Sequence, residues 1–194
     1  MSRPRRAARP FAAVVLAAGA GLRFGGPKAL MRLGERTALE VIVDVCRRAG
    51  AAQVVVTTGH HRDAVSPLVA VCDALEARNP HPELGMMSSV RTGVAAARIG
   101  LDLLVWPVDH PFVSVETALA LSGTPLGTAV VPICRGRGGH PVLLPAAWRE
   151  TVLAMDDRGG LDRVFRERRA EVVRLEVPDP GVLRDVDTPA DLEA

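Results

Sequence analysis

Aromatic residues are scarce in this chain of 194 residues, which has four phenylalanines, two tryptophans and no tyrosine. Proteins that bind single-stranded nucleic acids stack bases on aromatic side chains, so this sequence gives such a partner little to hold. The sequence also contains no apolar run near the roughly 20 residues that a membrane-spanning helix requires. We therefore expect neither a nucleic acid nor a membrane as a partner.

Cysteine is rare as well. The three cysteines, Cys46, Cys72 and Cys134, stand far apart, and no two of them form a Cys-x-x-Cys pair. An odd number at such spacing supports neither a disulfide framework nor a structural zinc site. The sequence predicts buried structural thiols, which suit a reducing compartment and hence a cytoplasmic protein.

Positive charge is concentrated at the start of the chain. Four of the 24 basic residues, Arg3, Arg5, Arg6 and Arg9, lie in the first ten positions, so 20 basic residues face 22 acidic ones elsewhere. The body of the chain is slightly acidic, which again disfavours a nucleic-acid partner. We predict a disordered basic leader at residues 1–10 and a single folded domain at residues 11–194, because 48% hydrophobic content over this length supports one core.

An apolar run that breaks into a glycine-rich loop is the most informative feature that the sequence does have. Residues 11–18 are all apolar, and four glycines follow by residue 26, together with Arg23 and Lys28. Such a run indicates a strand buried on both faces, whose loop leaves the carboxyl edge of a sheet, where α/β proteins bind ligands. Glycine backbones approach anions closely, so we interpret the loop as a phosphate cradle. A cleaved secretory signal, which the same segment imitates, would destroy it.

Two familiar glycine loops fit the cradle poorly. The P-loop requires Gly-x4-Gly-Lys-Ser/Thr, but Pro27 follows Gly26 where the lysine belongs, and no hydroxyl follows Lys28. The dinucleotide fingerprint requires Gly-x-Gly-x-x-Gly leading into a helix, but Phe24 takes the place of the third glycine. The second apolar segment, residues 53–58, also ends without the acidic residue that would hold a ribose. Both motifs are therefore disfavoured.

Apolar segments alternate with helical patterns along the chain. We predict helices over residues 37–49, 65–75 and 88–98, the last capped by Ser88 and Ser89, and strands over residues 53–58, 75–79 and 101–107. In the second half, residues 129–133 and 141–144 flank a glycine-arginine turn and predict a hairpin. Helices over 148–155 and 161–168 and an edge strand over 171–177 follow. This alternation predicts an α/β fold with a parallel sheet and right-handed crossovers.

Five motifs occur in order along the chain. They are Leu16-Ala17-Ala18-Gly19-x-Gly21-x-Arg23-x-Gly25 with Lys28, then Gly85-Met86-Met87-Ser88-Ser89-Val90, Pro107-Val108-Asp109-His110-Pro111, Gly139-His140-Pro141-Val142 and Asp185-Val186-Asp187-Thr188-Pro189-Ala190-Asp191. Together they resemble the MobA-like nucleotidyltransferases, in particular the molybdenum cofactor cytidylyltransferases. The resemblance implies a single-domain, doubly wound, mostly parallel sheet with a Rossmann-like nucleotidyltransferase fold and a small β-hairpin insertion.

Asp109 is the residue that best fits a metal. It follows an apolar segment that ends at Trp106, and Pro107 and Pro111 bracket it. Mg²⁺ keeps several waters and takes one or two protein carboxylates together with phosphate oxygens, so a rigid carboxylate beside a triphosphate suits it. We predict Mg²⁺ as the cofactor.

Catalysis is assigned to three residues. We predict that Arg23 and Lys28 clamp a triphosphate and that Asp109 holds the metal, because nucleotidyl transfer needs positioning and charge stabilisation. The resemblance implies a second metal ligand at Asp187. Alternatively, Asp187 caps a helix that begins at Pro189.

The nucleotide is expected to contact the cradle and the second motif. The predicted binding residues are Leu16, Ala17, Ala18, Gly19, Gly21, Arg23, Lys28, Gly85, Ser88 and Ser89. Ala18 favours CTP over GTP, because the resemblance associates guanylyl transfer with glycine at this position. The implied acceptor is a phosphorylated small molecule, molybdopterin in the preferred version, with a molybdoenzyme as a possible protein partner.

The resemblance fails in one place. The family often shows Gly-Asp-x-Gly-Ala-Arg where this chain has Asp156-Asp157-Arg158-Gly159-Gly160-Leu161, so the arginine expected to face the acceptor is displaced or absent. Arg135, Arg137 and His140 are the candidates to replace it. We interpret His110 and His140 as structural or substrate-contacting residues, because an attacking phosphate is already anionic and needs no strong base. The His60-His61 pair lacks a partner at metal-binding spacing, which favours a helix-start or loop role.

Three other functions remain open. Transfer to a sugar phosphate or another phosphorylated acceptor would use the same cradle. A non-catalytic nucleotide-binding or cofactor-binding accessory protein of a molybdoenzyme would not need Lys28, Asp109 and Asp187 together. A nicotinamide or flavin oxidoreductase is disfavoured by Phe24 and by the missing ribose acid.

Overall fold

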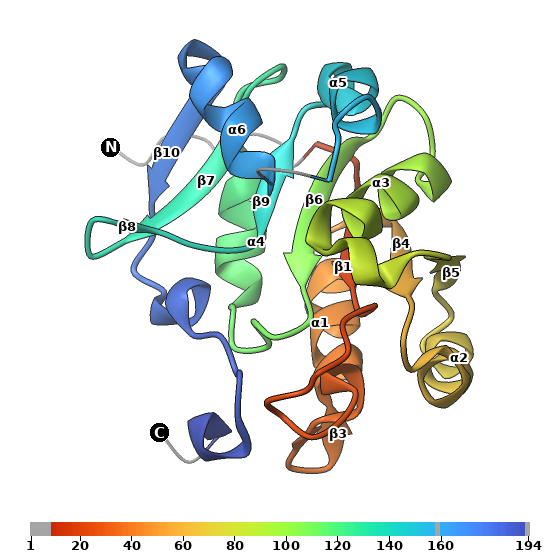
Figure 1. Ribbon diagram of the computed structural model, residues 1–194. Coiled ribbons are helices and arrows are strands. Elements are labelled where there is room, and N and C mark those ends of the chain that lie inside the picture. Colours follow the sequence, from red (N-terminus) through yellow and green to blue (C-terminus); the bar gives the residue numbers. More distant parts are fainter. Residues whose placement is uncertain (1–8, 158–159, 193–194) are drawn as a thin grey trace.

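A twisted eight-stranded sheet forms the centre of the protein in the computed structural model, which describes residues 9–157 and 160–192 (Figure 1). Seven strands follow the order β10-β7-β9-β6-β1-β4-β5, and β8 pairs with β7 beside this path. The strands are β1 (Phe11–Leu16), β4 (Ala51–Thr58), β5 (Leu75–Arg78), β6 (Asp102–Pro107), β7 (Ala129–Cys134), β8 (Arg137–Gly138), β9 (Val142–Leu144) and β10 (Val172–Glu176). A separate two-stranded ribbon joins β2 (Arg32–Leu33) to β3 (Arg36–Thr37).

The sheet is mostly parallel, as the sequence predicts. β1 pairs in parallel with both β4 and β6, β4 with β5, and β10 with β7. The antiparallel pairs all involve the predicted hairpin region, in which β9 lies between β6 and β7 and β8 turns back on β7. The doubly wound α/β fold with a small hairpin insertion is confirmed.

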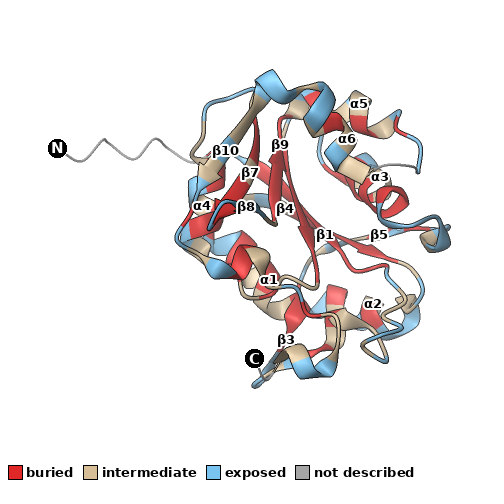
Figure 2. Ribbon diagram, turned by 60° about the vertical axis from the view of Figure 1, so that its left-hand side comes forward, coloured by how far each residue is buried: buried red, intermediate tan, exposed pale blue. Residues whose placement is uncertain are grey.

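Helices cover both faces of the sheet (Figure 2). One face carries α1 (Ala38–Arg48), α2 (Arg62–Val71) and α4 (Val115–Ser122), and the other carries α3 (Met86–Ala96), α5 (Arg149–Leu153) and α6 (Gly160–Glu167). Single turns of 3-10 helix occur at Lys28–Leu30, Pro82–Leu84, Ala146–Trp148, Arg169–Glu171, Pro180–Leu183 and Pro189–Leu192. Buried residues coloured red in Figure 2 run through the sheet between these two layers.

The central strand β1 explains why the apolar run is continuous. Alternate side chains of a strand point to opposite faces, so Phe11, Ala13 and Val15 enter the core under α1, whereas Val14 and Leu16 enter the core under α3. Every residue of β1 is buried. A strand buried on both faces cannot alternate apolar with polar residues.

The predicted helix over residues 37–49 is confirmed, and its ends have clear causes. Thr37 and Glu40 form a capping box, in which the Thr37 hydroxyl accepts from the Glu40 amide and the Glu40 carboxylate accepts from the Thr37 amide at 2.7 Å. Gly50, at φ 88°, follows the end of the helix in a conformation that glycine adopts most readily.

Two other helix predictions are wrong in their starts. Helix α3 begins at Met86 with Gly85 as its N-cap residue, not at Ser88 and Ser89, and the Ser88 hydroxyl instead donates to the Gly85 carbonyl. Helix α2 spans Arg62–Val71 and not residues 65–75, so its predicted end is wrong as well. The start is missed because the first turn is polar and shows no apolar periodicity. The sequence analysis also missed α4, whose N-cap Ser114 accepts from the Thr117 amide.

Predictions for the second half of the chain are largely confirmed. Val130 pairs with Leu143, so the two predicted hairpin segments do lie side by side, although the tight turn leads into β8. Helix α6 and the edge strand β10 lie within two residues of their predicted bounds. The predicted helix over 148–155 begins as a 3-10 turn and continues as α5.

Arg9, which the sequence analysis places in the leader, belongs to the folded part of the chain. Residues 1–8 lie outside the described part of the chain, but Arg9 is buried, and its Nη1 lies 2.7 Å from Oδ2 of Asp102. Assigning Arg9 to the leader is therefore wrong, because a buried ion pair fixes it to the start of β6. Among the described residues, no helix is long and apolar enough to span a membrane.

Candidate active site

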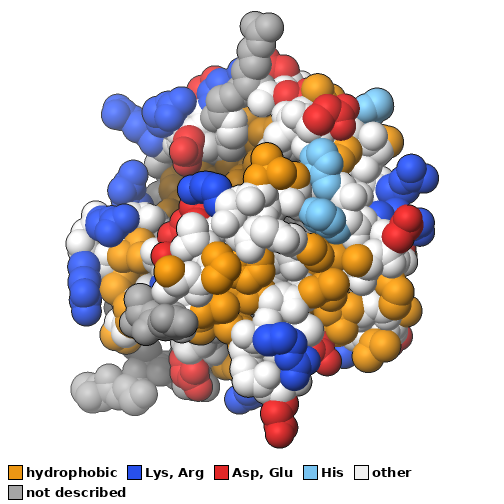
Figure 3. All heavy atoms as spheres, turned by 60° about the horizontal axis from the view of Figure 1, so that its bottom comes forward, with side chains coloured by type: hydrophobic (Ala, Val, Ile, Leu, Met, Phe, Trp, Pro, Cys, Tyr) orange, Lys and Arg blue, Asp and Glu red, His pale blue; other side chains and the backbone are white. Residues whose placement is uncertain are grey.

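A cleft of about 450 Å³ opens at the carboxyl edge of β1 and β6. Of the predicted site residues, those lining it are Leu16, Ala17, Ala18, Gly19, Gly21, Arg23, Lys28, Gly85, Ser89, Asp109 and Asp187. Ser88 is the one predicted binding residue that does not line it. On the face that includes this edge, hydrophobic side chains occupy much of the middle and charged side chains lie mainly toward the outline (Figure 3).

Two glycines of the cradle, Gly21 and Gly19, differ in whether the fold requires them. Gly21 has φ 59°, and a Cβ added there would lie 1.9 Å from the carbonyl oxygen of Gly26, so the fold itself requires glycine. Gly19 has no positive φ, and a Cβ added there would meet nothing within 4 Å. The fold does not require glycine at position 19, which leaves that space open to a ligand.

Three segments far apart in the sequence bring opposite charges together at the cleft. The Nζ of Lys28 lies 2.7 Å from Oδ1 of Asp187 and 3.2 Å from Oδ2 of Asp109. The Nη1 of Arg23 lies 2.6 Å from Oδ2 of Asp187. Two cations therefore face two carboxylates, and the Lys28 side chain is only 15% exposed.

Asp109 remains ionised despite its surroundings. Burial raises the pKa of Asp109, but a hydrogen bond from His110 and the charges of His110 and Lys28 outweigh it, so the pKa lies below its ordinary value. The Nδ1 of His110 is 2.9 Å from Oδ1 of Asp109. Asp109 thus presents a charged carboxylate to the cleft at neutral pH.

The alternative role of Asp187 as a helix cap is not what the structure shows. Both of its carboxylate oxygens face cations. The backbone N–H groups of Asp187 and Thr188 instead donate to Oδ2 of Asp191, at 2.9 and 2.7 Å. Asp191 therefore satisfies the turn that begins at Pro189, which leaves Asp187 directed into the cleft.

A buried asparagine that the sequence analysis missed organises the second motif. The Nδ2 of Asn79 donates to the hydroxyls of Ser88 at 2.8 Å and Ser89 at 3.0 Å, and Asn79 itself is 3% exposed. The single hydrogen of the Ser88 hydroxyl has two acceptors within reach, the Gly85 carbonyl at 2.8 Å and the His81 carbonyl at 3.0 Å. A lone Asn at the end of a short strand gave no signal in the sequence. These bonds commit the Ser88 hydroxyl to the protein.

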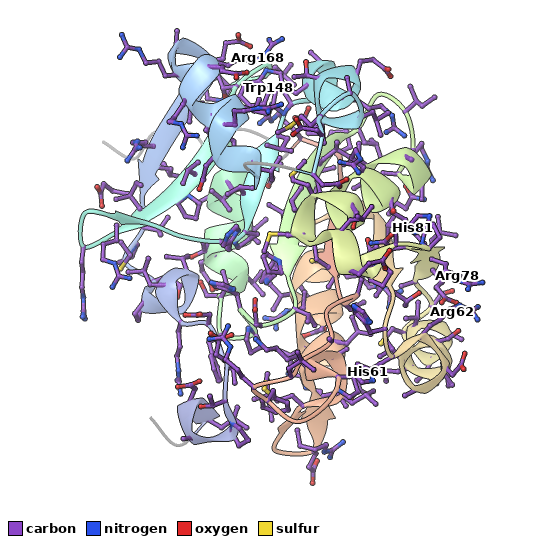
Figure 4. The ribbon with its side chains drawn as sticks, in the orientation of Figure 1. His61, Arg62, Arg78, His81, Trp148 and Arg168 are labelled. Carbon is purple, nitrogen blue, oxygen red and sulfur yellow. The ribbon has the colours of Figure 1, made fainter. Side chains whose placement is uncertain are left out.

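His61 supports the cradle from the turn between β4 and α2. It stands just before α2, and its Nε2 lies 2.8 Å from the Ala20 carbonyl oxygen. In Figure 4, His61 lies near the lower part of the molecule, with Arg62 and Arg78 near α2 and β5, whereas Trp148 and Arg168 lie together at the opposite end. The expected helix-start position of His61 is confirmed.

The remaining predicted histidines lie behind Asp109. The rings of His110 and His140 meet edge to face, with centroids 5.1 Å apart. Burial first, and then the charge of His110, lowers the pKa of His140 to about 4, so its ring is neutral at neutral pH. Neither histidine lines the cleft.

Arg135 and Arg137 lie in a second, smaller hollow of about 360 Å³. Arg184 joins them there, but so do Asp185 and Asp191, so the hollow holds both signs of charge. His140 does not line this hollow. The structure therefore separates the three residues that the sequence analysis offered together as acceptor contacts.

The cleft offers oxygen ligands for a metal. Within residues 9–157 and 160–192, no cluster of three or more His, Cys, Asp or Glu side chains could hold a metal alone. Asp109 and Asp187 share one Lys28 ammonium, so both carboxylates already face one cation. Two hard oxygen donors without nitrogen or sulfur fit Mg²⁺ or Mn²⁺ completed by phosphate oxygens and water.

Comparison with known proteins shows the family to which the chain belongs. Residues 13–172 match the model of the MobA-like NTP transferase domain. The chain belongs to this family. The matched range contains the cradle and Asp109, whereas Asp187 lies beyond it.

Proteins similar to this chain carry different names. The chain is 33% identical over 185 residues to a nicotine blue oxidoreductase of Paenarthrobacter nicotinovorans, covering 90% of this chain and 91% of the relative. It is 34% identical over 189 residues to a molybdenum cofactor guanylyltransferase of Acidiphilium cryptum, covering 94% and 92%. It is 30% identical to the bifunctional protein GlmU of Paracidovorax citrulli over 79% of this chain but only 30% of that protein.

Solved structures agree with the fold. Rv0371c from Mycobacterium tuberculosis H37Rv superposes with a TM-score of 0.82 at 26% identity, covering 95% of this chain and 99% of that one. A complex of Rv0371c with manganese superposes with a TM-score of 0.76 at 23% identity, covering 95% and 96%. The predicted family and fold are both confirmed.

Proposed function

We propose that this protein transfers a nucleoside monophosphate from a nucleoside triphosphate to a phosphorylated acceptor in a Mg²⁺-dependent reaction that releases pyrophosphate. The observation that carries the proposal is the meeting of Lys28, Asp109 and Asp187 at one cleft beside the glycine cradle. A member of the family that only binds nucleotides would not need two carboxylates facing two cations.

The ion pairs of the cleft are suited to exchange partners when substrate binds. Without substrate, Lys28 and Arg23 neutralise the two carboxylates. A triphosphate brings oxygens that attract both cations, and a divalent metal supplies the positive charge that Asp109 and Asp187 then lack. Nucleotide and metal are therefore expected to bind together far more strongly than either does alone.

The chemical step requires no strong base in the protein. A phosphate oxygen of the acceptor forms a bond to the α-phosphorus, and the bond from that phosphorus to the bridging oxygen of the β-phosphate breaks, so pyrophosphate leaves. Lys28 and Arg23 stabilise the charge on the phosphate oxygens, and Asp109 and Asp187 would hold the metal. The metal when bound neutralises the triphosphate and polarises it toward attack.

For the base, we propose CTP rather than GTP. Ala18 lines the cleft, and its methyl group takes up space that a glycine at this position would leave open. The relative named as a guanylyltransferase makes GTP the main competitor. The preferred acceptor is molybdopterin, with a sugar phosphate or another phosphorylated small molecule as the alternative.

A second candidate function has one observation in its favour. A relative that matches nearly the whole chain is named an oxidoreductase, so the same domain in this protein could hold a nicotinamide or flavin cofactor. The charged set of Lys28, Asp109 and Asp187 favours transferase chemistry over this alternative.

Thermal melts separate these functions. CTP, GTP, ATP and UTP, each with Mg²⁺ or with EDTA, and NADH are added to the protein in turn. The proposal expects the largest rise in melting temperature with CTP and Mg²⁺, and little with NADH. The nucleotide found is then combined with candidate acceptors while pyrophosphate release is measured. Protection by NADH, with none from any triphosphate, would refute transfer.

A further inference from the structure

One of the five motifs contributes nothing to the wall of the cleft. Gly139, His140 and Pro141 lie on the connection from β8 to β9, and none of them lines the cleft. We propose that His140 and His110 are positioning residues that fix the orientation of the Asp109 carboxylate for a metal-bound triphosphate. This inference rests on the proposed function.

The first contact of this arrangement is between His110 and Asp109. An ionised carboxylate can only accept hydrogen bonds, so the Nδ1 of His110 carries the hydrogen that meets Oδ1 of Asp109 at 2.9 Å. Oδ2 of Asp109 points to Lys28 in the cleft. His110 therefore holds one oxygen and leaves the other for a cation, which fixes the rotation of the carboxylate.

His110 is itself held on two sides. The indole Nε1 of Trp106 donates to the His110 carbonyl oxygen at 2.9 Å, which fixes its backbone. The His140 ring packs against the His110 ring at an interplanar angle of 68°, and the His110 side chain is 12% exposed. The imidazole of His110 thus has little freedom to swing away from Asp109.

His140 is anchored to the segment that carries the second carboxylate. Its backbone N–H donates to the Val182 carbonyl oxygen at 2.9 Å, and a Cβ at Gly139 would lie 2.1 Å from that oxygen. Only glycine permits this close crossing. Four residues later, the Val186 amide donates to the Asp109 carbonyl at 2.8 Å. The motif therefore fastens Asp109 and the segment preceding Asp187 to the same hairpin.

Partners that orient a metal ligand typically change metal affinity by 10- to 100-fold when removed. We expect His110→Leu to weaken the metal-dependent part of nucleotide binding by about tenfold or more. Binding of the nucleotide in EDTA should change little, because His110 does not line the cleft.

The test uses three substitutions at one position. The side-chain nitrogen of asparagine can take the place of Nδ1 of histidine, whereas that of glutamine reaches further. His110→Asn should therefore restore most of the metal-dependent affinity that His110→Leu loses, and His110→Gln should restore less. His140→Ala should have a smaller effect than His110→Leu, and His140→Phe, which keeps a ring against His110, should have less effect still.

The measurement is nucleotide affinity by calorimetry with Mg²⁺ and with EDTA, using the triphosphate that protects the wild type most. His81→Leu is the matched control, because it removes another histidine-carboxylate contact, 3.2 Å from Glu83, between exposed side chains near α3 and β5 (Figure 4). Melting temperatures without ligand exclude variants that fail to fold.

The outcomes are distinct. Loss in His110→Leu with recovery in His110→Asn supports the inference. Wild-type metal dependence in His110→Leu overturns it while leaving the proposed function intact. An equal loss in His110→Leu and His110→Asn also overturns it, because the hydrogen bond would then not matter. If no triphosphate binds the wild type, the proposed function fails and this inference fails with it.

Discussion

Strand β6 has an aspartate near each end, and the two serve the protein differently. Asp102, at the start of the strand, is 7% exposed, with one oxygen 2.7 Å from Arg9 and the other accepting from the Ala146 amide. Asp109, just past the end, has a side chain 27% exposed at a cleft and shares Lys28 with Asp187. Both carboxylate oxygens of Asp102 are occupied by buried protein groups, so a ligand cannot reach them. Asp109 faces a lysine at the cleft, and a bound metal can take the place of that lysine.

This contrast separates stability from function along a single strand. A buried ion pair holds the fold only while both partners remain, because either charge alone is costly in the interior. A partly exposed pair contributes little to stability but can rearrange when a charged ligand arrives. Substitutions at the two ends should therefore affect different measurements.

The largest effect is expected from Asp102→Ala. This change leaves Arg9 charged and buried without its partner and removes the acceptor of the Ala146 amide. The free energy of unfolding, measured by urea denaturation, should fall by about 3–5 kcal/mol. Nucleotide affinity of the remaining folded protein should stay close to that of the wild type. A loss of less than about 1 kcal/mol would show that the ion pair of Arg9 and Asp102 does not stabilise the start of β6.

Asp109→Asn should produce the opposite pattern. The amide keeps the shape of the side chain but cannot neutralise a metal, so pyrophosphate release should fall by about 100-fold or more. The free energy of unfolding should change much less than in Asp102→Ala, because Lys28 keeps Asp187 as a partner. Asp44→Asn, at an exposed pair with Arg36, is the control for the same chemical change. Near-normal release in Asp109→Asn would contradict the metal assignment.

Acid should lower the free energy of unfolding through protonation of His140, which packs behind Asp109. The folded protein lowers the pKa of His140 to about 4 from its ordinary 6.5, so the unfolded chain binds the proton first as the pH falls. The contribution of the neutral His140 to the free energy of unfolding is therefore fully present above pH 6.5. It is lost between about pH 6.5 and 4 and amounts to at most about 3 kcal/mol. Urea denaturation across this range checks it against His140→Phe. A slope in the variant as steep as in the wild type would contradict the role of His140.

The smallest effects extend the contrast to the two glycines of the cradle. Gly21→Ala should lower the melting temperature, because its Cβ would collide with the Gly26 carbonyl. Gly19→Ala should leave the melting temperature unchanged or slightly raised, since the space is empty and alanine restricts the unfolded chain. It should nevertheless weaken triphosphate binding by about tenfold, or roughly 1.4 kcal/mol. If Gly19→Ala binds as the wild type does, the cradle is not where the phosphates lie.

The sequence predicts the fold well where burial dictates the pattern. Strand β1 is apolar throughout because both of its faces are covered. The bounds of α1 are predictable from its capping box and from the glycine that follows it. The starts of α2 and α3 were misjudged because Arg62 begins a polar turn and because Gly85 caps α3 by its backbone alone. Such ends are set by tertiary contacts that periodicity does not record.

The candidate site was predictable as a set of motifs but not as a set of contacts. The motifs predict that Lys28, Asp109 and Asp187 share one site. The structure adds that the Lys28 ammonium contacts both carboxylates. Asn79 and the packing of His140 on His110 could not be foreseen, because they depend on side chains from separate elements. The sequence alone cannot show which partner a polar residue will meet.

The most direct test of the exchange at the cleft is a crystal structure of the protein with CTP and Mn²⁺, with the metal located by its anomalous signal. We predict a metal peak bonded to carboxylate oxygens of Asp109 and Asp187 at about 2.1 Å and to the triphosphate, with Lys28 moved from the carboxylates to the phosphates. A nucleotide bound elsewhere, or one bound here while Lys28 still bridges Asp109 and Asp187 without a metal, would contradict the account.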